Sequence, residues 1–302
     1  MSTAIATAPS SSTSRSLRAD DLSVESDRFD AVKAASIYRQ HGCLVVRGLH
    51  RAYVAEIAAD VAQATEESWA GIGQSRKSEE GWWLHGSLFI PGPPNSGRDR
   101  QLMLVGLSYR RSAAMLRSAI DERTCGLAAE VLGPNVELMD DGQVVQKEPV
   151  GGHAKWLHQD SAYFQHRDQG PFACLIYLVD TNLTNGALHV VPGSHQLGYL
   201  PHVDTSSHLG LPPAEWPMER GTPIIGKAGD AIFFHQHMVH GSPANHSQAV
   251  RPVCIHRYRA IGDTIIAHAT TAANRAHNGA ESAEKREREV NRLVVHGRRP
   301  LV

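Results

Sequence analysis

The feature that most constrains the fold is a succession of short apolar segments between residues 136 and 260. They read VELMDDGQVVQKEP, ACLIYLVD, ALHVVPG, DAIFFHQ and PVCIHRYRA, and each is bounded by Gly, Pro, Asn or Asp. Short runs of this kind predict β-strands, and several in succession predict a barrel or a sandwich with helices packed outside. We therefore expect a mixed α+β protein whose core, at about residues 135–260, is mainly β.

Upstream of these segments the apolar spacing changes to that of helices. Helices are predicted at residues 30–42, where Gly42 closes the pattern, at 51–69, and at 112–133, where Gly133 ends it. The apolar run CLVVRGL, residues 43–49, predicts a short strand between the first two helices.

The remaining segments are expected to be less regular. Residues 78–100 are rich in Gly, Pro and aromatic residues and predict a structured loop, whereas the charged segment 280–293 predicts a solvent-facing helix in a C-terminal tail. Residues 1–24, rich in Ser, Thr and Ala at their start, are expected to be a disordered leader. This leaves a single domain at 25–302.

Composition narrows the possible partners. The formal net charge of -1 gives no electrostatic footprint for nucleic acid or an anionic membrane, and no apolar run approaches the roughly 20 residues of a membrane-spanning helix. The four Cys residues lack C-x-x-C spacing, so neither a disulfide framework nor a Cys-built zinc site is indicated, and a reducing cytoplasm is expected. A small molecule is the expected partner, and the oligomeric state is left open.

One His and one Asp, two residues apart, suggest a metal site. His158 and Asp160 would point to the same face of a strand, and His240, beyond a later apolar strand, could supply a third ligand from the opposite sheet. Two His nitrogens and one carboxylate form the facial triad of non-heme iron(II) enzymes, which leaves coordination positions open. On its own the H-x-D pattern is weak in a chain with 18 His residues.

Arg251 lies eleven residues after His240 and shares one strand face with Val253 and Ile255. If that face is inward, the Arg251 guanidinium is buried and needs an anion, for which a bidentate ligand carboxylate is the best partner. Arg257 has the same strand parity and is a rival anchor. A separate zinc site built from His235, His237 and His240 is an alternative use of those histidines.

Four of these segments, in this order, resemble the phytanoyl-CoA dioxygenase family of Fe(II)/2-oxoglutarate oxygenases. They are CLVVRGL, HQDSAYF, NGALHVVPGSH and HGSPANHSQAVR, and the resemblance spans roughly residues 30–260. It implies a double-stranded β-helix, a jelly-roll barrel buttressed by helices. One departure is clear: some members place a Trp against the cosubstrate about sixteen residues after the Asp, where this chain reads CLIYL.

Carried over to this chain, the resemblance implies that His158, Asp160 and His240 are the iron ligands. It also implies that Arg251 pairs with the distal carboxylate of 2-oxoglutarate, that Ser242 supports this carboxylate, and that Gln143 touches the cosubstrate. The implied reaction consumes 2-oxoglutarate and O2 and oxidises, most simply hydroxylates, a C–H bond. No Lys/Arg cluster suited to coenzyme A is evident in the sequence, which favours a small secondary metabolite as substrate.

Two segments are predicted to form a lid over the barrel mouth: SEEGWWLHGSLF, residues 78–89, and SSHLGLPPAEWPMERG, residues 206–221. Both combine aromatic and polar residues, as small-molecule pockets do. The residues expected to contact substrate are Trp83, Tyr163, Trp216 and His237. Two alternatives remain open for the whole chain: a cupin-like metalloenzyme that does not use 2-oxoglutarate, and a non-catalytic ligand-binding barrel.

Overall fold

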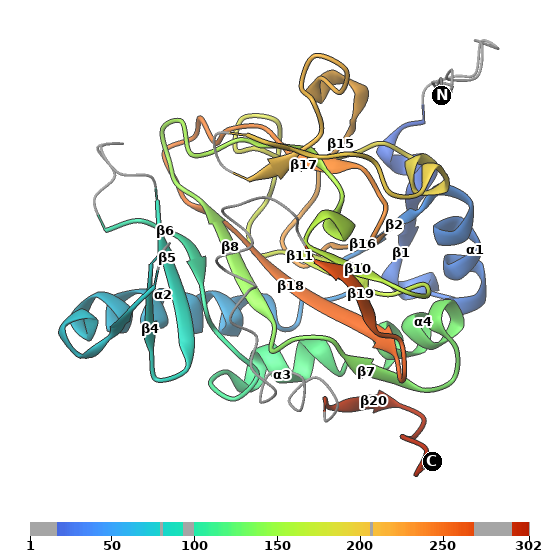
Figure 1. Cartoon of the computed structure of the whole chain (residues 1–302), viewed down its shortest axis with the longest axis horizontal. Coiled ribbons are helices and arrows are strands. Elements are labelled where there is room, and N and C mark those ends of the chain that lie inside the picture. The colour runs from blue at the N-terminus through green and yellow to red at the C-terminus, as the bar shows by residue number, and fades with distance from the viewer. Residues whose placement is uncertain (1–16, 79–80, 93–99, 206–207, 269–291, 302) are drawn as a thin grey trace, which may run out of the picture.

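The computed structural model describes residues 17–78, 81–92, 100–205, 208–268 and 292–301. In this part of the chain, the helices are short and lie mainly in the first half (Figure 1). The α-helices are α1 (Ala31–His41), α2 (Val54–Ala70), α3 (Ala113–Ala119) and α4 (Glu122–Leu132), and the 3-10 turns are η1 (Ala19–Leu22), η2 (Ser26–Arg28), η3 (Ile72–Gln74), η4 (Asp160–Ala162), η5 (Ser194–Leu197) and η6 (Met218–Arg220). Among the described residues, no helix is both long and apolar enough to cross a bilayer.

The larger of the sheets, here called the major sheet, has 12 strands. Its main path runs in the order β1-β2-β16-β11-β18-β8-β6-β5-β4-β3, and β7 and β20 join it at β18. These strands are β1 (Ser23–Glu25), β2 (Cys43–Arg47), β3 (Arg76–Lys77), β4 (Trp82–Leu84), β5 (Ser87–Pro91), β6 (Leu102–Val105), β7 (Val136–Leu138), β8 (Gln143–Lys147), β11 (Phe172–Tyr177), β16 (Ala231–His235), β18 (Arg251–Ala260) and β20 (Val294–His296).

A second sheet of four strands, here called the minor sheet, has the order β15-β12-β17-β9. Its strands are β9 (Lys155–His158), β12 (Leu188–Val190), β15 (Thr222–Ile224) and β17 (His240–Ser242). Two antiparallel ribbons complete the strands: β10 (Phe164–His166) with β19 (Ile265–His268), and β13 (Val203–Asp204) with β14 (Leu209–Gly210). The prediction of a mainly β protein with few helices is confirmed.

The alternation of side chains along β11 divides the apolar core into two layers. Phe172, Cys174 and Ile176 belong to the cluster that the helices cover. Ala173, Leu175 and Tyr177 point the other way, into a cluster shared with minor-sheet residues such as Leu188, Val190 and Ile224. In Figure 1, β15 and β17 accordingly lie above the central strands, and α3 and α4 lie below them. Residues of the major sheet that lie on the same face as Ala173, Leu175 and Tyr177 therefore face the minor sheet.

The helix predictions for residues 30–42, 51–69 and 112–133 are confirmed, with one subdivision. α1 ends at Gly42, whose φ of 73° is the left-handed conformation that glycine adopts most easily. The predicted helix at 112–133 is two helices, because Asp121 caps a new start: its carboxylate accepts hydrogen bonds from the backbone nitrogens of Arg123 and Thr124.

Two other predictions need correction. Residues 78–100 are not only a loop, since β4 and β5 lie within them and extend the major sheet beyond β6. The predicted disorder of residues 1–24 is wrong at its end, because η1 and β1 are ordered and Leu22 is fully buried. The predicted helix at 280–293 lies outside the described residues except for its last two positions, which are not helical.

Candidate metal centre

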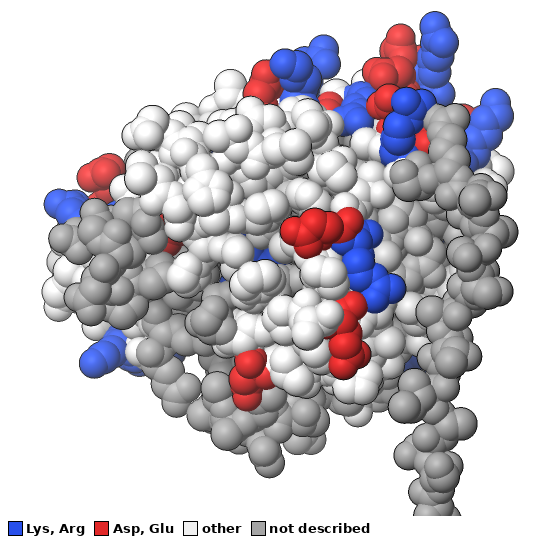
Figure 2. Space-filling model, turned by 90° about the horizontal axis from the view of Figure 1, so that it is seen from above, with Lys and Arg blue, Asp and Glu red and all other residues white. Residues whose placement is uncertain are grey.

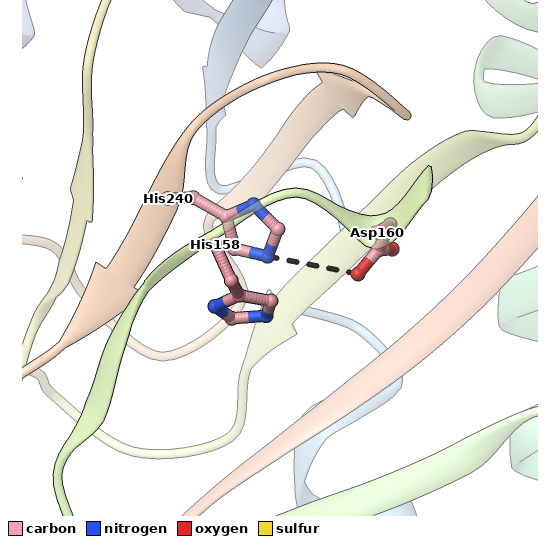
Figure 3. Close-up of side chains that lie close together, drawn as sticks. All are labelled: His158, Asp160 and His240. Atoms are coloured by element: carbon pink, nitrogen blue, oxygen red, sulfur yellow. Dashed lines mark ion pairs between the residues drawn. The ribbon is translucent and has the colours of Figure 1, made fainter. Parts of the chain in front are cut away.

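His158, Asp160 and His240 converge at one end of the minor sheet (Figure 3). His158 ends β9, Asp160 begins η4 directly afterwards, and His240 begins β17, which pairs with β9 so that His240 lies opposite His158. The third ligand therefore comes from the neighbouring strand of the same sheet, and the expectation that it comes from the opposite sheet is wrong. One ligand atom from each residue lies within 4.8 Å of the other two.

The close spacing of these two strands depends on Gly241. A Cβ atom at this position would lie 2.7 Å from the carbonyl oxygen of Lys155 and 3.0 Å from the backbone nitrogen of Leu157. Both are backbone atoms of β9, so they cannot move away as the end of a flexible side chain would. Glycine next to His240 thus lets the two histidine-bearing strands approach each other.

Both histidines are oriented by backbone hydrogen bonds. The Nδ1 of His158 lies 2.8 Å from the carbonyl oxygen of Trp156, and the Nδ1 of His240 lies 2.9 Å from that of Met238. A carbonyl only accepts, so each Nδ1 is the protonated nitrogen and each Nε2 keeps a free lone pair. Burial, with His240 and His208 nearby, holds the pKa of His158 well below its usual value, which favours the neutral ring that binds metal.

The carboxylate completes a donor set that suits a divalent metal. The Nε2 of His240 and the Oδ1 of Asp160 are 3.8 Å apart, as the dashed line in Figure 3 marks, and the rings of His158 and His240 are 4.3 Å apart between centroids. Two imidazoles and one carboxylate, with Asp160 and His240 buried, match the facial triad of non-heme iron(II) enzymes. The residues present therefore fit an iron(II) ion.

The alternative zinc site does not form. In the part of the chain that the structure describes, the triad is the only group of three His, Cys, Asp or Glu residues placed to hold a metal. The Nδ1 of His235 accepts a hydrogen bond from the backbone nitrogen of His237, and the Nδ1 of His237 lies 2.9 Å from the hydroxyl of Ser161. His237 thus braces the turn that carries Asp160, and its predicted contact with substrate stays a prediction.

Arg251, on the inner face of β18, is a buried cation whose charge is not balanced locally. It is 4% exposed, and its Nη2 donates to the carbonyl oxygen of Gly186 at 2.7 Å. Its Nε has no hydrogen-bond partner, and none of the described Asp or Glu residues forms an ion pair with it. Burial lowers the pKa of Arg251 to about 10, as expected for a cation that lacks an anion.

Lys147 is a second buried cation at this end and is not among the residues predicted from the sequence. It lies opposite Arg251 across the β8–β18 pair and is 3% exposed. Its Nζ donates to the carbonyl oxygens of His153 and Ser242, the latter at 3.3 Å. Burial, added to by the charge of Arg251, lowers the pKa of Lys147 well below its usual value. Lys147 is four residues after Gln143 on the same strand, so the two side chains point to the same face. This spacing is the sequence signal from which an inward-facing Lys147 could be predicted.

Arg257, the rival anchor, has carboxylate partners of its own. Its Nε lies 3.4 Å from the Oδ2 of Asp160, and its Nη1 lies 3.1 Å from the Oδ2 of Asp140. Burial alone would lower the pKa of Arg257, but the charges of Asp160 and Asp140 outweigh it and the pKa is raised. Arg257 is therefore not an anchor waiting for a ligand.

Gln143 lies against Arg257 and not against Arg251. In the amide orientation that satisfies both side chains, its oxygen accepts from Nη1 of Arg257 at 3.1 Å and from Nη2 at 3.2 Å. Across the β8–β18 pair, Gln143 lies opposite Ile255, between the two arginines. Its contact with the cosubstrate stays a prediction.

Tyr163, one of the predicted substrate contacts, lies beside the triad. Its ring is edge-on to His158 with 6.3 Å between centroids, and its hydroxyl donates to the carbonyl oxygen of Leu209 and accepts from the backbone nitrogen of Leu209. The ring of His208 also packs against His158, with 4.9 Å between the ring centroids. The middle of the insertion between β12 and β15 therefore reaches the metal centre.

The two tryptophans lie elsewhere. Trp216 packs with Leu157, Leu211 and Val239, and Leu157 alternates with His158 along β9, so this cluster covers the outer face of the minor sheet. This packing does not support the predicted lid position of Trp216, which stays a prediction. Trp83 lies on β4, with β5 and β6 between it and β8, and its ring faces the guanidinium of Arg76. Its predicted role at the substrate has no supporting contact among the described residues.

Comparison with known proteins gives one family match. The sequence profile of the family described as "Phytanoyl-CoA dioxygenase (PhyH)" matches residues 38–253, which is more than two thirds of the chain and includes the triad and Arg251.

Individual relatives are more distant. A probable alpha-ketoglutarate-dependent hypophosphite dioxygenase of Stutzerimonas stutzeri is 30% identical over 147 residues, which cover 46% of this chain and 50% of that protein. The ectoine dioxygenase of Stutzerimonas stutzeri (strain A1501) is 25% identical over 272 residues, 82% of this chain and 84% of that protein. Peroxisomal phytanoyl-CoA dioxygenase of Mus musculus is 30% identical over 167 residues, 51% of this chain and 48% of that protein. The chain thus spans about half the length of some of these relatives.

Solved structures share the fold at low sequence identity. The non-heme alpha ketoglutarate dependent carbocyclase SnoK from nogalamycin biosynthesis superposes with a TM-score of 0.57 at 16% identity, covering 85% of this chain and 92% of that chain. The apoform of EctD from S. alaskensis gives a TM-score of 0.55 at 19% identity, covering 79% of this chain and 80% of that chain.

Proposed function

The chain belongs to the phytanoyl-CoA dioxygenase family, and on that premise we propose that it is an iron(II)- and 2-oxoglutarate-dependent dioxygenase acting on a small molecule. In this proposal His158, Asp160 and His240 hold the metal. When bound, iron(II) supplies the redox chemistry that couples oxidative decarboxylation of 2-oxoglutarate by O2 to oxidation, most simply hydroxylation, of a substrate C–H bond.

The observation that carries the proposal is the unbalanced positive charge beside the triad. Arg251 and Lys147 face each other on adjacent strands and are both buried. Arg251 has no anion among the described residues, and although the buried Glu148 carboxylate acts on Lys147, no ion pair joins the two. A buried cation without a paired anion is unfavourable, so this pair is suited to a ligand that brings its own carboxylate. The distal carboxylate of 2-oxoglutarate is such a group, and the guanidinium of Arg251 can bind it through two parallel hydrogen bonds.

The supporting residues would fix the position of this carboxylate. The carbonyl of Ser242 holds the ammonium of Lys147, and Ser242 is the second residue after the ligand His240 on β17, which joins the carboxylate end of the site to the metal end. The Ser242 hydroxyl is proposed to donate to the carboxylate. The two sheets, with their shared inner core, are proposed to form the double-stranded β-helix of the family, with its mouth at the triad end.

The substrate is proposed to be a small molecule without coenzyme A. On the face drawn in Figure 2, Lys and Arg side chains are interspersed with Asp and Glu, and the described residues of this face form no single basic patch for the CoA phosphates. Relatives are named for very different substrates, from hypophosphite to ectoine to phytanoyl-CoA. The structural neighbour from nogalamycin biosynthesis supports secondary metabolism as the setting.

The proposal is tested by anaerobic loading with iron(II) followed by addition of 2-oxoglutarate and O2, with and without a metabolite library. Succinate should form, and a true substrate should raise its rate and give an oxidised product in matching amount. Iron binding without any consumption of 2-oxoglutarate would instead support a metalloenzyme that does not use this cosubstrate. Failure to bind either ligand would support a non-catalytic barrel.

The compartment is a further part of the proposal. All four cysteines are free thiols buried in the fold, which is compatible with the reducing cytoplasm expected from the sequence.

A further inference from the structure

Asp160 has two carboxylate oxygens that face different partners. Oδ1 points toward the triad, 3.8 Å from the Nε2 of His240. Oδ2 points to the opposite side, where the Nε of Arg257 lies 3.4 Å away. The carboxylate therefore lies between the metal position and a fixed cation.

The guanidinium of Arg257 is itself held on several sides. Asp140 accepts from its Nη1, Gln143 lies against Nη1 and Nη2, and the ring of Phe164 faces it with the Cζ atom 5.3 Å from the ring centroid. The residue is 7% exposed. Since these contacts come from several segments of the chain, Arg257 has little freedom to follow a rotation of the Asp160 carboxylate.

We propose that Arg257 is a positioning residue that keeps Asp160 a one-oxygen ligand by holding its Oδ2 away from the metal. The inference rests on the proposed function. Two histidines and one carboxylate oxygen leave about three positions open on a six-coordinate ion. The keto acid end of 2-oxoglutarate takes two of them and the oxidant needs the third. If Oδ2 swings onto the metal, 2-oxoglutarate still binds but the third position is lost.

The contact distance decides what kind of effect to expect. At 3.4 Å, the Nε–Oδ2 contact is longer than a strong charge-assisted hydrogen bond. Its contribution lies in the direction it gives the carboxylate and not in tight binding of the metal. Loss of Arg257 should therefore change the number of open positions while leaving metal affinity and 2-oxoglutarate affinity nearly as they are.

An anionic substrate is a less favoured partner for Arg257. The positive charge of Arg257 is already faced by Asp160 and Asp140, so a further anion would meet two carboxylates. This contrasts with Arg251, for which the described residues supply none. A substrate KM that is higher in the Arg257 variants than in the wild type, with an unchanged number of water molecules on the metal, would point to this alternative.

The test counts the water molecules on a bound metal and does not rely on turnover. Purified protein is loaded with Mn(II), and the inner-sphere water number is obtained from water proton relaxation. Arg257→Met removes every donor while keeping a long side chain, and Arg257→Lys retains one. We expect the water number of Arg257→Met to fall by roughly one third, from about three to about two, and Arg257→Lys to recover most of it.

Two further measurements complete the design. Anaerobic binding of nitric oxide, a stand-in for O2, to the Fe(II)·2-oxoglutarate form should weaken at least tenfold in Arg257→Met, while the Kd for 2-oxoglutarate stays within about threefold. Asp140→Asn is the matched control, because it removes the other carboxylate partner of Arg257 but leaves Asp160 held; its water number should equal that of the wild type.

Folding is controlled separately. Asp140 is partly exposed, at 31% of its side chain, so water can solvate it after Arg257 is lost. If Arg257→Met does not fold, the double variant Arg257→Met/Asp140→Asn is used instead, because it also removes the Asp140 charge that the loss of Arg257 leaves unpaired. A folded, metal-loaded variant with the wild-type water number overturns the inference. Absence of Mn(II) binding by the wild type would instead overturn the proposed metal site.

Discussion

Arg251 and Arg257 lie on the same strand, share its inner face, and are nearly equally buried, at 4% and 7% exposure. Their surroundings are opposite. Among the described residues, Arg251 has a backbone carbonyl and a neighbouring lysine, and its pKa is lowered to about 10 by burial. Arg257 lies between two carboxylates, which raise its pKa in spite of burial. An unbalanced buried arginine indicates a ligand site, whereas a balanced one holds other residues in place.

The largest effect is expected from removing a metal ligand, because the cosubstrate that Arg251 is proposed to bind and the carboxylate that Arg257 holds both need the bound metal to take part in the reaction. His158→Ala or His240→Ala leaves a two-residue site, so iron(II) affinity should fall by at least about a hundredfold and turnover should be lost. Equilibrium dialysis with metal analysis measures the affinity. Tight iron binding by either variant would mean that the triad is not the metal site, and the roles assigned to Arg251 and Arg257 would then lose their basis.

The second effect separates the two arginines. Arg251→Ala should weaken 2-oxoglutarate binding by about 2 to 5 kcal/mol, which is roughly thirtyfold to several thousandfold. Arg257→Met should change it by no more than about threefold. Isothermal titration with Co(II)-loaded protein and 2-oxoglutarate measures both. The reverse result, a large loss for Arg257→Met and none for Arg251→Ala, would exchange the two roles.

A smaller loss is expected at Lys147. Lys147→Met should weaken 2-oxoglutarate binding by about 1.5 kcal/mol, typical of a hydrogen bond to a charged group, or roughly tenfold. Lys147→Arg keeps the charge and should recover part of this loss. The same titration applies, and Val32→Ala, a substitution at an exposed position of α1, serves as a control for general perturbation. Unchanged affinity in Lys147→Met would assign the whole carboxylate site to Arg251.

A still smaller effect on the reaction is expected at the hydroxyl of Tyr163, which ties η4 to the insertion. Tyr163→Phe removes its hydrogen bonds to the Leu209 backbone, at a cost of about 1 kcal/mol. Affinities for iron and 2-oxoglutarate should not change, but succinate should exceed product by a few-fold because water reaches the site. Matching amounts of the two would mean that Tyr163 only anchors the loop.

Trp216→Ala is the counterpart on the outer face of the minor sheet. Since Trp216 packs with Leu157 and Val239 away from the ligands, the variant should lower the free energy of unfolding by about 1 to 3 kcal/mol. The ratio of succinate to product should stay that of the wild type. Chemical denaturation and product analysis test the two parts, and a coupling defect without a stability loss would restore the lid position predicted from the sequence.

Local spacing explains why the triad could be predicted from the sequence. His158 and Asp160 are two residues apart, and the extended backbone of Gln159 between them is enough to place them on one side, although Asp160 itself begins η4 and is not on the strand. The parity of Arg251 and Val253 was likewise sufficient to predict an inward guanidinium. Parity could not separate Arg251 from Arg257, because their difference arises from Asp140 and Asp160, which reach the strand from other parts of the chain.

The predictions that the structure does not support concern contacts between distant segments. The glycines of residues 78–100 predict a loop, yet a Cβ at Gly81 would lie 1.9 Å from the carbonyl oxygen of Phe89 on the neighbouring strand, so this glycine lets the two segments approach closely. The side on which Trp216 packs depends on which face of the minor sheet exposes Leu157 and Val239. Neither fact is contained in the local pattern of apolar residues.

The narrow space at Gly241 limits how this centre can be diversified. Any side chain there would push β17 from β9 and separate the two histidines together with their strands. Directed evolution of new chemistry on this scaffold should therefore reject almost all exchanges at Gly241. In a saturation library selected for metal retention, glycine at 241 should be recovered as consistently as the histidines, although it touches no ligand.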